Sequence, residues 1–391
     1  MKTNNKKNIA VIFGGKSAEH DVSIVTAHIP IIDSLVISKK YNIIPIYINK
    51  EGIWYSSKEM IKLSFFQDKD YLNKLNKKDK VQIFIEDGFF VKQNNLFSEK
   101  IKIDLVFPAL HGTYGEDGSL TGLLRMANVP FVGCDIFASA VAMDKVLTKQ
   151  ILSSENIPVT KYEWFTKKDF EIKKEEILNS IKNLNYPLFI KPVHLGSSIG
   201  ITKAKNEKEL INGIEVALFY DDKILVEEGV NNLIEVTLPM IGNNEILFGN
   251  IERPLSKEDF FDFNTKYINS NSKISNNGVN TEYSEIPAKI DQFFKDKVLD
   301  YAKKTFNILG CSGIVRIDFL INEFTKEVFV NEVNTLPGSL YAHNFKKSGI
   351  TNLELVDKLI DYAFERFESK NAIINNFDSK ILQSVGGGKK Q

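Results

Sequence analysis

Apolar runs that end in glycine turns dominate the first third of the chain. Residues 8–13 and 103–110 are apolar except for Asn8 and Asp104, and glycines follow them at 14–15 and at 112. Residues 43–48 form a third run of this kind. A strand that is apolar at nearly every position suits a parallel sheet whose two faces are both covered. The alternation of such strands with glycine turns and helical stretches predicts a parallel α/β domain over residues 1–133.

One helix is predicted directly after the first strand. Ser17 can cap this helix, which we expect to begin near Ala18. Pro30 is expected to kink or end it, because proline cannot donate a backbone hydrogen bond inside a helix. Residues 68–80 are polar and rich in lysine, so we expect them to form a surface excursion.

The remaining chain predicts a mixed α+β arrangement. Helices are expected at 138–153, 208–220, 291–309 and 353–369, a hairpin around 196–200, and strands at 313–320 and 327–334. Residues 256–280 are rich in Asn and Ser, and a loop of this length is usually a lid or disordered. We therefore expect an N-terminal α/β substrate domain (1–133), a small central domain (134–226), a C-terminal domain with the lid loop 256–280 (227–372) and a loose tail (373–391).

Composition removes several functional classes. The 391 residues contain 50 basic and 50 acidic side chains, so the net charge expected of a nucleic-acid binder is missing. Two cysteines, Cys134 and Cys311, exclude a disulfide framework. We find no leader peptide and no apolar stretch of about 18 residues that would span a membrane. These features predict a cytoplasmic protein that binds neither nucleic acid nor membrane.

The strongest chemical pattern lies in the last two predicted strands. Residues two apart in a strand point to the same face, so Arg316 shares a face with Asp318, and Glu332 with Asn334. If the strands pair, three oxygen ligands converge beside one guanidinium. Oxygen ligands in small number suit Mg²⁺, which binds one or two carboxylates together with substrate phosphates. Either pair alone would more often be a solvated strand face.

Three glycine-rich loops add to this pattern. Lys191 precedes the loop 196–200, where backbone N–H groups can approach phosphate oxygens, although an ordinary hairpin explains this loop equally well. Residues 14–20 form a turn between strand and helix, in which Glu19 would attract an ammonium group or complement the helix dipole. The loop at 111–118 follows a strand and is dense in glycine, as ligand-binding loops often are.

Together these segments resemble one family. The strings GGKSAEHDVS (14–23), HGTYGEDGSLTG (111–122), ASAVAMDK (138–145), KPVHLGSSIGITKA (191–204), FFDFNTKY (260–267), and GIVRIDF and NEVNTLPG within 313–338 occur in the order typical of D-alanine–D-alanine ligases. The chain is therefore similar to that family of the ATP-grasp superfamily from about residue 8 to 366. The resemblance implies an N-terminal parallel-sheet domain followed by a two-part ATP-grasp fold.

The resemblance also implies the reaction and the partners. The expected activity is ATP-dependent ligation of two D-alanines through an acyl phosphate for peptidoglycan precursor synthesis, with ADP and phosphate released. The expected cofactors are ATP and two Mg²⁺ or Mn²⁺ ions, and the expected assembly is a homodimer.

The resemblance further assigns roles to individual residues. The expected ATP-binding residues are Lys145, Lys191, Ser198, Glu227, Val230, Glu235 and Lys266. The expected metal ligands are Asp318, Glu332 and Asn334. Residues expected to position the first D-alanine and close the loop are Glu19, Ser197 and Tyr267, with His111 nearby. Arg316 and the Gly338 N–H would stabilise the oxyanion, and Ser339 and Leu340 would bind the second substrate.

The main departure from the family pattern concerns the second substrate. Ser339-Leu340 directly follows Gly338 in the sequence, whereas the common family form has several more residues between this glycine and its Ser-Leu pair. A shorter loop would reshape the acceptor pocket, so a D-alanine–D-serine ligase or another D-alanine–X ligase is the alternative function. Two more distant functions also stay open, namely a different ATP-grasp carboxylate–amine ligase and a non-catalytic nucleotide-binding protein. The first would lack the loops at 14–20 and 111–118, and the second would lack a metal ligand.

Overall fold

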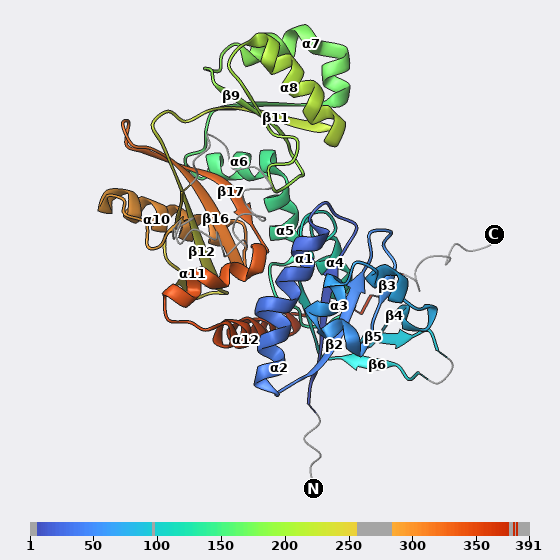
Figure 1. Ribbon diagram of the computed structural model, residues 1–391. Coiled ribbons are helices and arrows are strands. Elements are labelled where there is room, and N and C mark those ends of the chain that lie inside the picture. The colour runs from blue at the N-terminus through green and yellow to red at the C-terminus, as the bar shows by residue number, and fades with distance from the viewer. Residues whose placement is uncertain (1–5, 96–97, 256–283, 375–377, 380, 382–391) are drawn as a thin grey trace, which may run out of the picture.

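A parallel sheet forms the N-terminal part of the computed structural model, which describes residues 6–95, 98–255, 284–374, 378–379 and 381 (Figure 1). Its strand order is β3-β2-β1-β7, and β1 pairs in parallel with both β2 and β7. The bounds are β1 Asn8–Gly14, β2 Asn42–Ile48, β3 Trp54–Tyr55 and β7 Leu105–Pro108. Ile9, Val11 and Phe13 belong to one core cluster, and Ala10 and Ile12 to another. Both faces of β1 are therefore covered, which confirms the parallel α/β prediction.

The helix after β1 differs from the sequence prediction in two ways. It begins at His20 rather than near Ala18, and Ser17 does not cap it, because the Ser17 hydroxyl accepts from the Glu19 N–H at 3.1 Å. Pro30 does not end it either. The wider π-helical turn Ala27–Ile32 contains this proline, and helix α1 (His20–Thr26) runs through it into α2 (Asp33–Ser38).

The expectation that no stretch is long and apolar enough to cross a membrane was wrong for this helical segment, the one described stretch that passes that test by length and composition. The segment His20–Ser38 has a mean hydropathy of 1.4, but 56% of it is buried inside the protein. It packs against β1 and α12, so its apolar character is explained by the core.

Smaller elements complete the N-terminal part. A three-stranded antiparallel sheet that the sequence analysis did not predict consists of β4 Val81–Glu86, β5 Gly88–Gln93 and β6 Ile101–Ile103. The helical segments are η2 Lys58–Ile61, α3 Leu63–Gln67, η3 Tyr71–Lys74, η4 Lys77–Asp79 and α4 Ser119–Met126. The two 3₁₀ turns η3 and η4 have no buried residue, which agrees with a surface excursion over residues 68–80.

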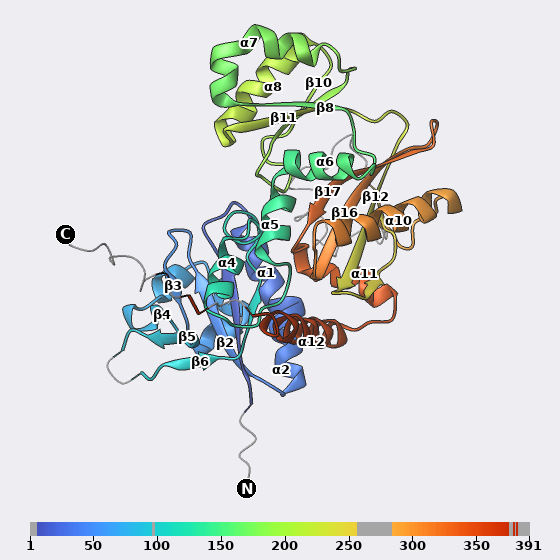
Figure 2. The same ribbon diagram turned by 180° about the vertical axis from the view of Figure 1, so that it is seen from behind.

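The central part is a four-stranded antiparallel sheet with two helices on one face (Figures 1 and 2). Its order is β10-β9-β11-β8, with bounds β8 Tyr162–Thr166, β9 Leu188–Pro192, β10 Thr202–Ala204 and β11 Lys223–Glu228. The helices are α7 Lys167–Ile181 and α8 Glu207–Tyr220. Strands β9 and β10 form the hairpin predicted around residues 196–200.

The helix predicted over 138–153 is two helices. These are α5 Ile136–Met143 and α6 Lys145–Ser154. Asp144 separates them, with an extended backbone and a side chain that accepts from the Val146 and Leu147 N–H groups. The sequence pattern missed this break because helical spacing of apolar residues continues across it. In both views α6 lies between the central sheet and the C-terminal sheet.

The C-terminal part is built on the antiparallel sheet β13-β12-β16-β17. Its strands are β12 Leu233–Gly242, β13 Ile246–Phe248, β16 Gly313–Asn322 and β17 Glu327–Asn334, with a separate pair β14 Arg253–Pro254 and β15 Ser284–Glu285. The helical segments are α10 Gln292–Ile308, η5 Gly338–Tyr341, α11 Ala342–Lys347 and α12 Asn352–Asn371. The predicted lid 256–280 and most of the tail fall outside the described residues.

Helix α12 packs against both the N-terminal sheet and the C-terminal sheet. Its buried residues Leu355, Val356 and Leu359 lie in the same core cluster as Ile9 of β1 and Ile314 of β16. The N-terminal and C-terminal sheets are therefore packed on a shared core, and the domain boundaries given above stay predictions.

Candidate active site

The polar ladder predicted on the last two strands is present. Strands β16 and β17 pair in antiparallel fashion, with Arg316 opposite Asn334 and Asp318 opposite Glu332. Alternate residues such as Ile317 face the core of the C-terminal sheet, so the polar residues share the other face. The four predicted side chains therefore meet on one surface of the sheet.

Arg316 and Asp318 form a bidentate ion pair within this ladder. The Arg316 Nε and Nη2 atoms donate to the two carboxylate oxygens of Asp318, each at 2.7 Å. The Arg316 guanidinium lies 5.2 Å from the centre of the Tyr341 ring. Burial alone would lower the pKa of Arg316, but Asp318 and Tyr341 outweigh it and raise the pKa. The guanidinium is thus fixed in place and permanently charged, as an anion-stabilising group must be.

The same ladder offers ligands for a hard metal ion. Asp318 and Glu332 supply carboxylate oxygens, and Asn334 lies 3.3 Å from Asp318 through its amide nitrogen. A carboxylate has about four acceptor positions, so Asp318 can bind Arg316 and a cation together. Two carboxylates and one amide oxygen are a donor set suited to Mg²⁺ or Mn²⁺. These residues fit a divalent ion.

Glu332 lies at the electrostatic centre of the site. Its negative charge favours the charged forms of Lys145, Lys191 and Arg316, which come from three different parts of the fold, although burial outweighs it at Lys145 and lowers the pKa of that lysine. It also raises the pKa of Glu116 in the N-terminal part. One carboxylate on β17 is therefore near cationic groups of the helix α6, of the strand β9 and of its own sheet.

Lys145 and Lys191 are the buried cations next to the glycine-rich loop. The Lys145 ammonium donates to the backbone oxygens of Val193 at 3.3 Å and Leu195 at 2.6 Å, and burial lowers its pKa. Lys191 forms an ion pair with Glu227. Burial would lower the pKa of Lys191, but Glu227 outweighs it and raises the pKa. Both lysines are placed to meet an anion from the side of the central sheet.

Lys149 and Thr160 were missed by the sequence analysis. The Lys149 ammonium lies 2.8 Å from a Glu227 oxygen and donates to the Thr160 hydroxyl at 2.9 Å. The Thr160 hydroxyl in turn donates to Glu227 at 2.9 Å. Burial would raise the pKa of Glu227, but the two lysines outweigh it and lower the pKa. Glu227 is therefore an ionised carboxylate held by Lys149, Lys191 and Thr160.

Glu19 and Ser197 meet across the gap between the N-terminal and central parts. The Ser197 hydroxyl donates to a Glu19 carboxylate oxygen. A Cβ atom added at Gly112 would lie 2.8 Å from Glu19 Oε2, and one at Gly196 would lie 3.4 Å from the same atom. The glycines of two separate loops thus let the backbone approach this carboxylate closely.

Thr26 connects the predicted His111 to the turn after β17. The Thr26 hydroxyl lies 2.8 Å from His111 Nε2 and accepts from the Ser339 N–H at 2.9 Å. Burial lowers the pKa of His111 to about 4, so the ring is neutral. The Thr26 hydroxyl therefore links the neutral His111 ring to the Ser339 N–H. Thr26 gave no sequence signal, because it is one small polar residue on an apolar helix.

Glu116 lies beside this group. Its carboxylate accepts from the Gly112 N–H at 2.8 Å and lies 4.0 Å from His111 Nδ1. Burial and the charge of Glu19 raise the pKa of Glu116 to about 8. At neutral pH Glu116 is therefore mainly a carboxylic acid beside the Glu19 side chain.

The turn that carries the predicted acceptor residues is strained. Ser339, Leu340 and Tyr341 have φ angles of +50°, +52° and +49°, a region that costs L-residues energy and that persists only where surrounding structure holds it. The Leu340 side chain is fully buried and its N–H donates to Pro337 at 2.9 Å. The Leu340 side chain therefore belongs to the core.

The structure brings most predicted site residues into one region. Glu19, His111, Lys145, Lys191, Ser197, Glu227, Arg316, Asp318, Glu332, Asn334 and Ser339 are linked by the contacts and charges given above. Glu235 contributes to the raised pKa of Lys191. Lys266 and Tyr267 lie outside the described residues. The individual roles of these residues, and those of Ser198, Val230 and Gly338, stay predictions.

Models of one enzyme family match both halves of the chain. The model for the D-ala D-ala ligase N-terminus matches residues 8–134, and the model for the D-ala D-ala ligase C-terminus matches residues 151–361. A D-alanine–D-alanine ligase of Thermosipho melanesiensis is 40% identical over 380 residues, which cover 96% of this chain and 98% of the relative. Ligase B of Clostridium tetani is 38% identical, with 92% and 94% of the two chains covered.

Solved structures of similar proteins share this fold. The VanG D-Ala:D-Ser ligase of Enterococcus faecalis has a TM-score of 0.75 and 34% identity, over 92% of this chain and 100% of that one. The D-alanine-D-alanine ligase of Coxiella burnetii has a TM-score of 0.75 and 28% identity, over 94% and 97% of the two chains.

Proposed function

The chain belongs to the D-alanine–D-alanine ligase family, and we propose that its site joins two D-alanines into D-alanyl-D-alanine while ATP is cleaved to ADP and phosphate. The dipeptide is a building block of peptidoglycan precursors. One observation carries the proposal: a fixed Arg316–Asp318 pair and two buried lysines surround a single carboxylate, Glu332. The Glu19–Ser197 contact lies beside Glu116, whose pKa Glu332 also raises.

The chemistry explains why these groups are needed together. A carboxylate is a poor electrophile, so the carboxylate of the first D-alanine is phosphorylated by ATP to an acyl phosphate. The amine of the second D-alanine then attacks through a tetrahedral intermediate. Negative charge develops on oxygen in both steps, and preorganised cations and N–H donors stabilise it.

Residues from different parts of the fold would have different roles in this reaction. Lys145 and Lys191 would bind phosphate oxygens from the central part. Arg316, held by two hydrogen bonds to Asp318, would face the developing oxyanion. The Glu19 side chain, beside the protonated Glu116, would hold the ammonium of the first D-alanine. His111 stays neutral at neutral pH and cannot repel that ammonium.

Divalent ions complete this picture. We propose that Asp318, Glu332 and Asn334 hold two Mg²⁺ or Mn²⁺ ions, which would neutralise phosphate charge while the phosphoryl group is transferred. We further propose that ATP lies between the central and C-terminal sheets, that the protein is cytoplasmic, where ATP is available, and that it forms a homodimer.

The acceptor is the one point where a second candidate has support. The turn after Gly338 is short, and the VanG D-Ala:D-Ser ligase shares 34% identity with the chain. D-serine as the second substrate would require a hydroxyl partner near Ser339. The larger set of relatives named for D-alanine at both positions favours D-alanine.

Product identification tests both candidates. The enzyme is given ATP and Mg²⁺ with D-alanine alone, and then with equal D-alanine and D-serine, while phosphate release is followed and products are separated by mass. D-alanyl-D-alanine as the dominant product supports the proposal. Dominant D-alanyl-D-serine moves the assignment to the second candidate. A folded sample that binds ATP but releases no phosphate with either mixture contradicts both.

A further inference from the structure

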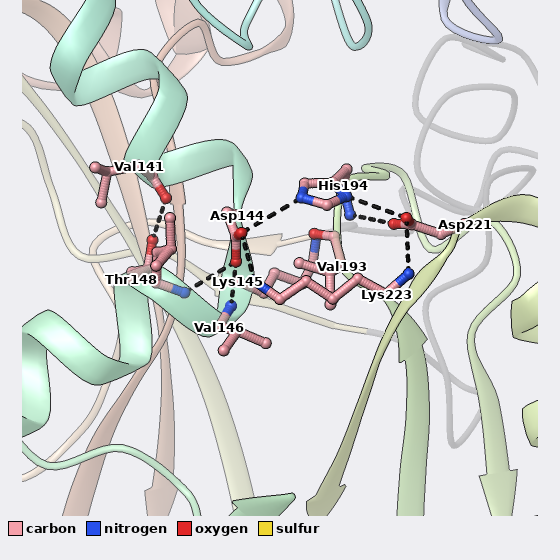
Figure 3. A network of polar contacts seen from close by, with 10 residues as sticks. Val141, Asp144, Lys145, Val146, Thr148, Val193, His194, Asp221 and Lys223 are labelled. Carbon is pink, nitrogen blue, oxygen red and sulfur yellow. Dashed lines mark hydrogen bonds and ion pairs between the residues drawn. The ribbon is translucent and has the colours of Figure 1, made fainter. Parts of the chain in front are cut away.

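His194 lies between Lys191 and the glycine-rich loop, the two segments of the central part that we propose to face ATP. It lies in the segment that connects Lys191 to the glycine-rich loop at 196–200. Its neighbours on either side, Val193 and Leu195, are the residues whose backbone oxygens accept from the Lys145 ammonium. Figure 3 shows the His194 side chain between Asp144 and Asp221. Any shift of His194 therefore moves both oxygens that hold Lys145.

Two carboxylates from different helices hold the His194 ring. Nδ1 lies 3.1 Å from Asp221, and the His194 backbone N–H donates to the same carboxylate at 2.7 Å. Nε2 lies 3.4 Å from Asp144. Asp221 ends α8 and Asp144 begins α6. A carboxylate only accepts, so Nδ1 carries a hydrogen, and the second carboxylate beside Nε2 favours the imidazolium form of the ring.

The surrounding charges favour this protonated form. The charged groups that face the ring from the neighbouring elements are Asp144 and Lys145 of α6, Asp221 and Asp222 after α8, Lys223 of β11 and Asp117 across the adjacent cavity. The hydrogen bonds to Asp144 and Asp221 raise the pKa of His194 to about 9. The ring borders a cavity of about 420 Å³ and its side chain is 44% exposed, so solvent protons reach it.

We propose that His194, as an imidazolium, is a positioning residue that ties the segment 193–195 to helices α6 and α8 and thereby places Lys145 and the glycine-rich loop against the ATP phosphates. This inference rests on the proposed function of the site as an ATP site. His194 itself touches no phosphate in this scheme, and it acts through the Val193 and Leu195 carbonyls.

The conformation of the loop explains why such a tie is needed. Ser197 and Ser198 have backbone φ angles of +53° and +60°, which residues other than glycine rarely adopt. The loop is held from the N-terminal part by the Ser197–Glu19 contact. His194 supplies the opposite anchor, from the central part. Loss of either anchor lets the loop relax from this strained shape.

Three variants test the proposal through the binding of Mg²⁺–ADP, measured by calorimetry without D-alanine. His194→Gln keeps a polar side chain but cannot donate to both carboxylates, and we expect about tenfold weaker binding near neutral pH. His194→Arg restores two donors and a permanent charge, and we expect binding within about threefold of wild type. Lys223→Met is the matched control, because Lys223 binds the same Asp144 oxygen at 2.7 Å yet its side chain does not hold the loop.

The pH profile separates positioning from mere folding. Wild-type binding should weaken as the pH rises through about 9. His194→Arg should lack that part of the decline, while any decline from Lys145 persists in both proteins. Thermal unfolding midpoints of all variants report structural damage separately.

Two results overturn the proposal. One is nucleotide binding by His194→Gln that equals wild type at every pH. The other is a loss in Lys223→Met as large as in His194→Gln, which would show that any damage to the Asp144 network has the same effect. Neither outcome depends on ligation. If wild type binds Mg²⁺–ADP but makes no dipeptide, the proposed function fails while the His194 test still stands.

Discussion

The ammonium of Lys149 lies 2.8 Å from a carboxylate oxygen of Glu227, and both side chains are only 2% exposed. Lys191 contacts the other Glu227 oxygen, so two cations share one buried anion. A buried charge is tolerated where it is paired and hydrogen-bonded, and Thr160 completes the set. Binding of a nucleotide beside Lys191 would therefore begin from an arrangement that is already ordered.

Lys149→Met should destabilise the protein strongly. Removal of one partner from a buried ion pair leaves the remaining charge poorly compensated, and we expect a loss of about 3 kcal/mol. The midpoint of urea unfolding measures it. The same variant should also bind ADP more weakly. Without Lys149, Lys191 is the one described lysine that pairs with Glu227, so it is less available to a nucleotide phosphate.

An exposed pair provides the control. Lys304 lies 2.7 Å from Asp300, four residues earlier on α10, and the two side chains are 54% and 52% exposed. Lys304→Met should cost less than about 0.5 kcal/mol. Equal losses in the two variants would contradict the importance assigned to the buried network.

Gly112→Ala should impair binding of the first D-alanine. Gly112 has a φ of +69°, and a Cβ there would lie 2.6 Å from the Ser17 hydroxyl and 2.8 Å from Glu19. We expect the KM for the first D-alanine to rise about tenfold or more, because Glu19 must move. Steady-state kinetics with varied D-alanine measure this.

Gly310→Ala separates the clash from backbone strain. Gly310 has a similar φ of +64°, but a Cβ there would meet no atom within 4 Å. This variant should lose about 1 kcal/mol of stability and keep its KM for D-alanine. A rise in KM of the same size in both variants would mean that strain, not the displacement of Glu19, is responsible.

Arg316→Lys should reduce turnover while the fold persists. Lysine keeps the charge but cannot make the two parallel hydrogen bonds of 2.7 Å to Asp318. We expect kcat to fall by about 100-fold or more, the size seen when one oxyanion donor is lost. The rate of phosphate release at saturating substrate checks it, and a kcat within a few-fold of wild type would remove Arg316 from the oxyanion role.

Glu116→Gln should alter how stability depends on pH. The pKa of Glu116 is raised to about 8 in the folded state, above the ordinary value of 4.5. The folded protein therefore keeps a proton that the unfolded chain loses, and its stability falls as the pH rises between these values. The advantage of wild type over Glu116→Gln should shrink from about pH 5 to about pH 8.

Other titrating residues do not obscure this comparison. The raised pKa of His194 makes stability fall with rising pH above its ordinary value of 6.5, and the lowered pKa of His111 makes stability rise with pH below that value. The effect of His194 cancels in the difference between the two urea midpoints. His111 lies 4.0 Å from Glu116, so the comparison is made above about pH 7, where His111 is neutral in the folded and the unfolded protein alike. A difference that stays constant with pH would show that Glu116 is ionised in the folded state.

Regular strand geometry made the C-terminal half of the site predictable. Side chains alternate with a period of two, so Arg316 and Asp318 had to share a face, and pairing with the neighbouring strand brought Asn334 beside them. The parallel order of the N-terminal strands also followed from their uninterrupted apolar runs.

Contacts between distant segments were not predictable from local patterns. Glu19 and Ser197 are 178 positions apart, and only the family resemblance suggested that they meet. Lys149 is one more lysine on an amphipathic helix, and nothing in its neighbours shows that it is buried against Glu227. The break at Asp144 escaped notice because apolar spacing continues across it, whereas tertiary hydrogen bonds to His194 and Lys223 fix the turn there.

The shared core of strand β1 and helix α12 has a consequence for synthesis of the protein. Ile9, Val11 and Phe13 are synthesised more than 300 residues before Leu355 and Leu359, which belong to the same core. The nascent chain therefore carries an uncovered apolar surface through most of translation, a state prone to aggregation or to capture by chaperones. A stop codon just before residue 352 would spare every predicted site residue and still leave that surface bare.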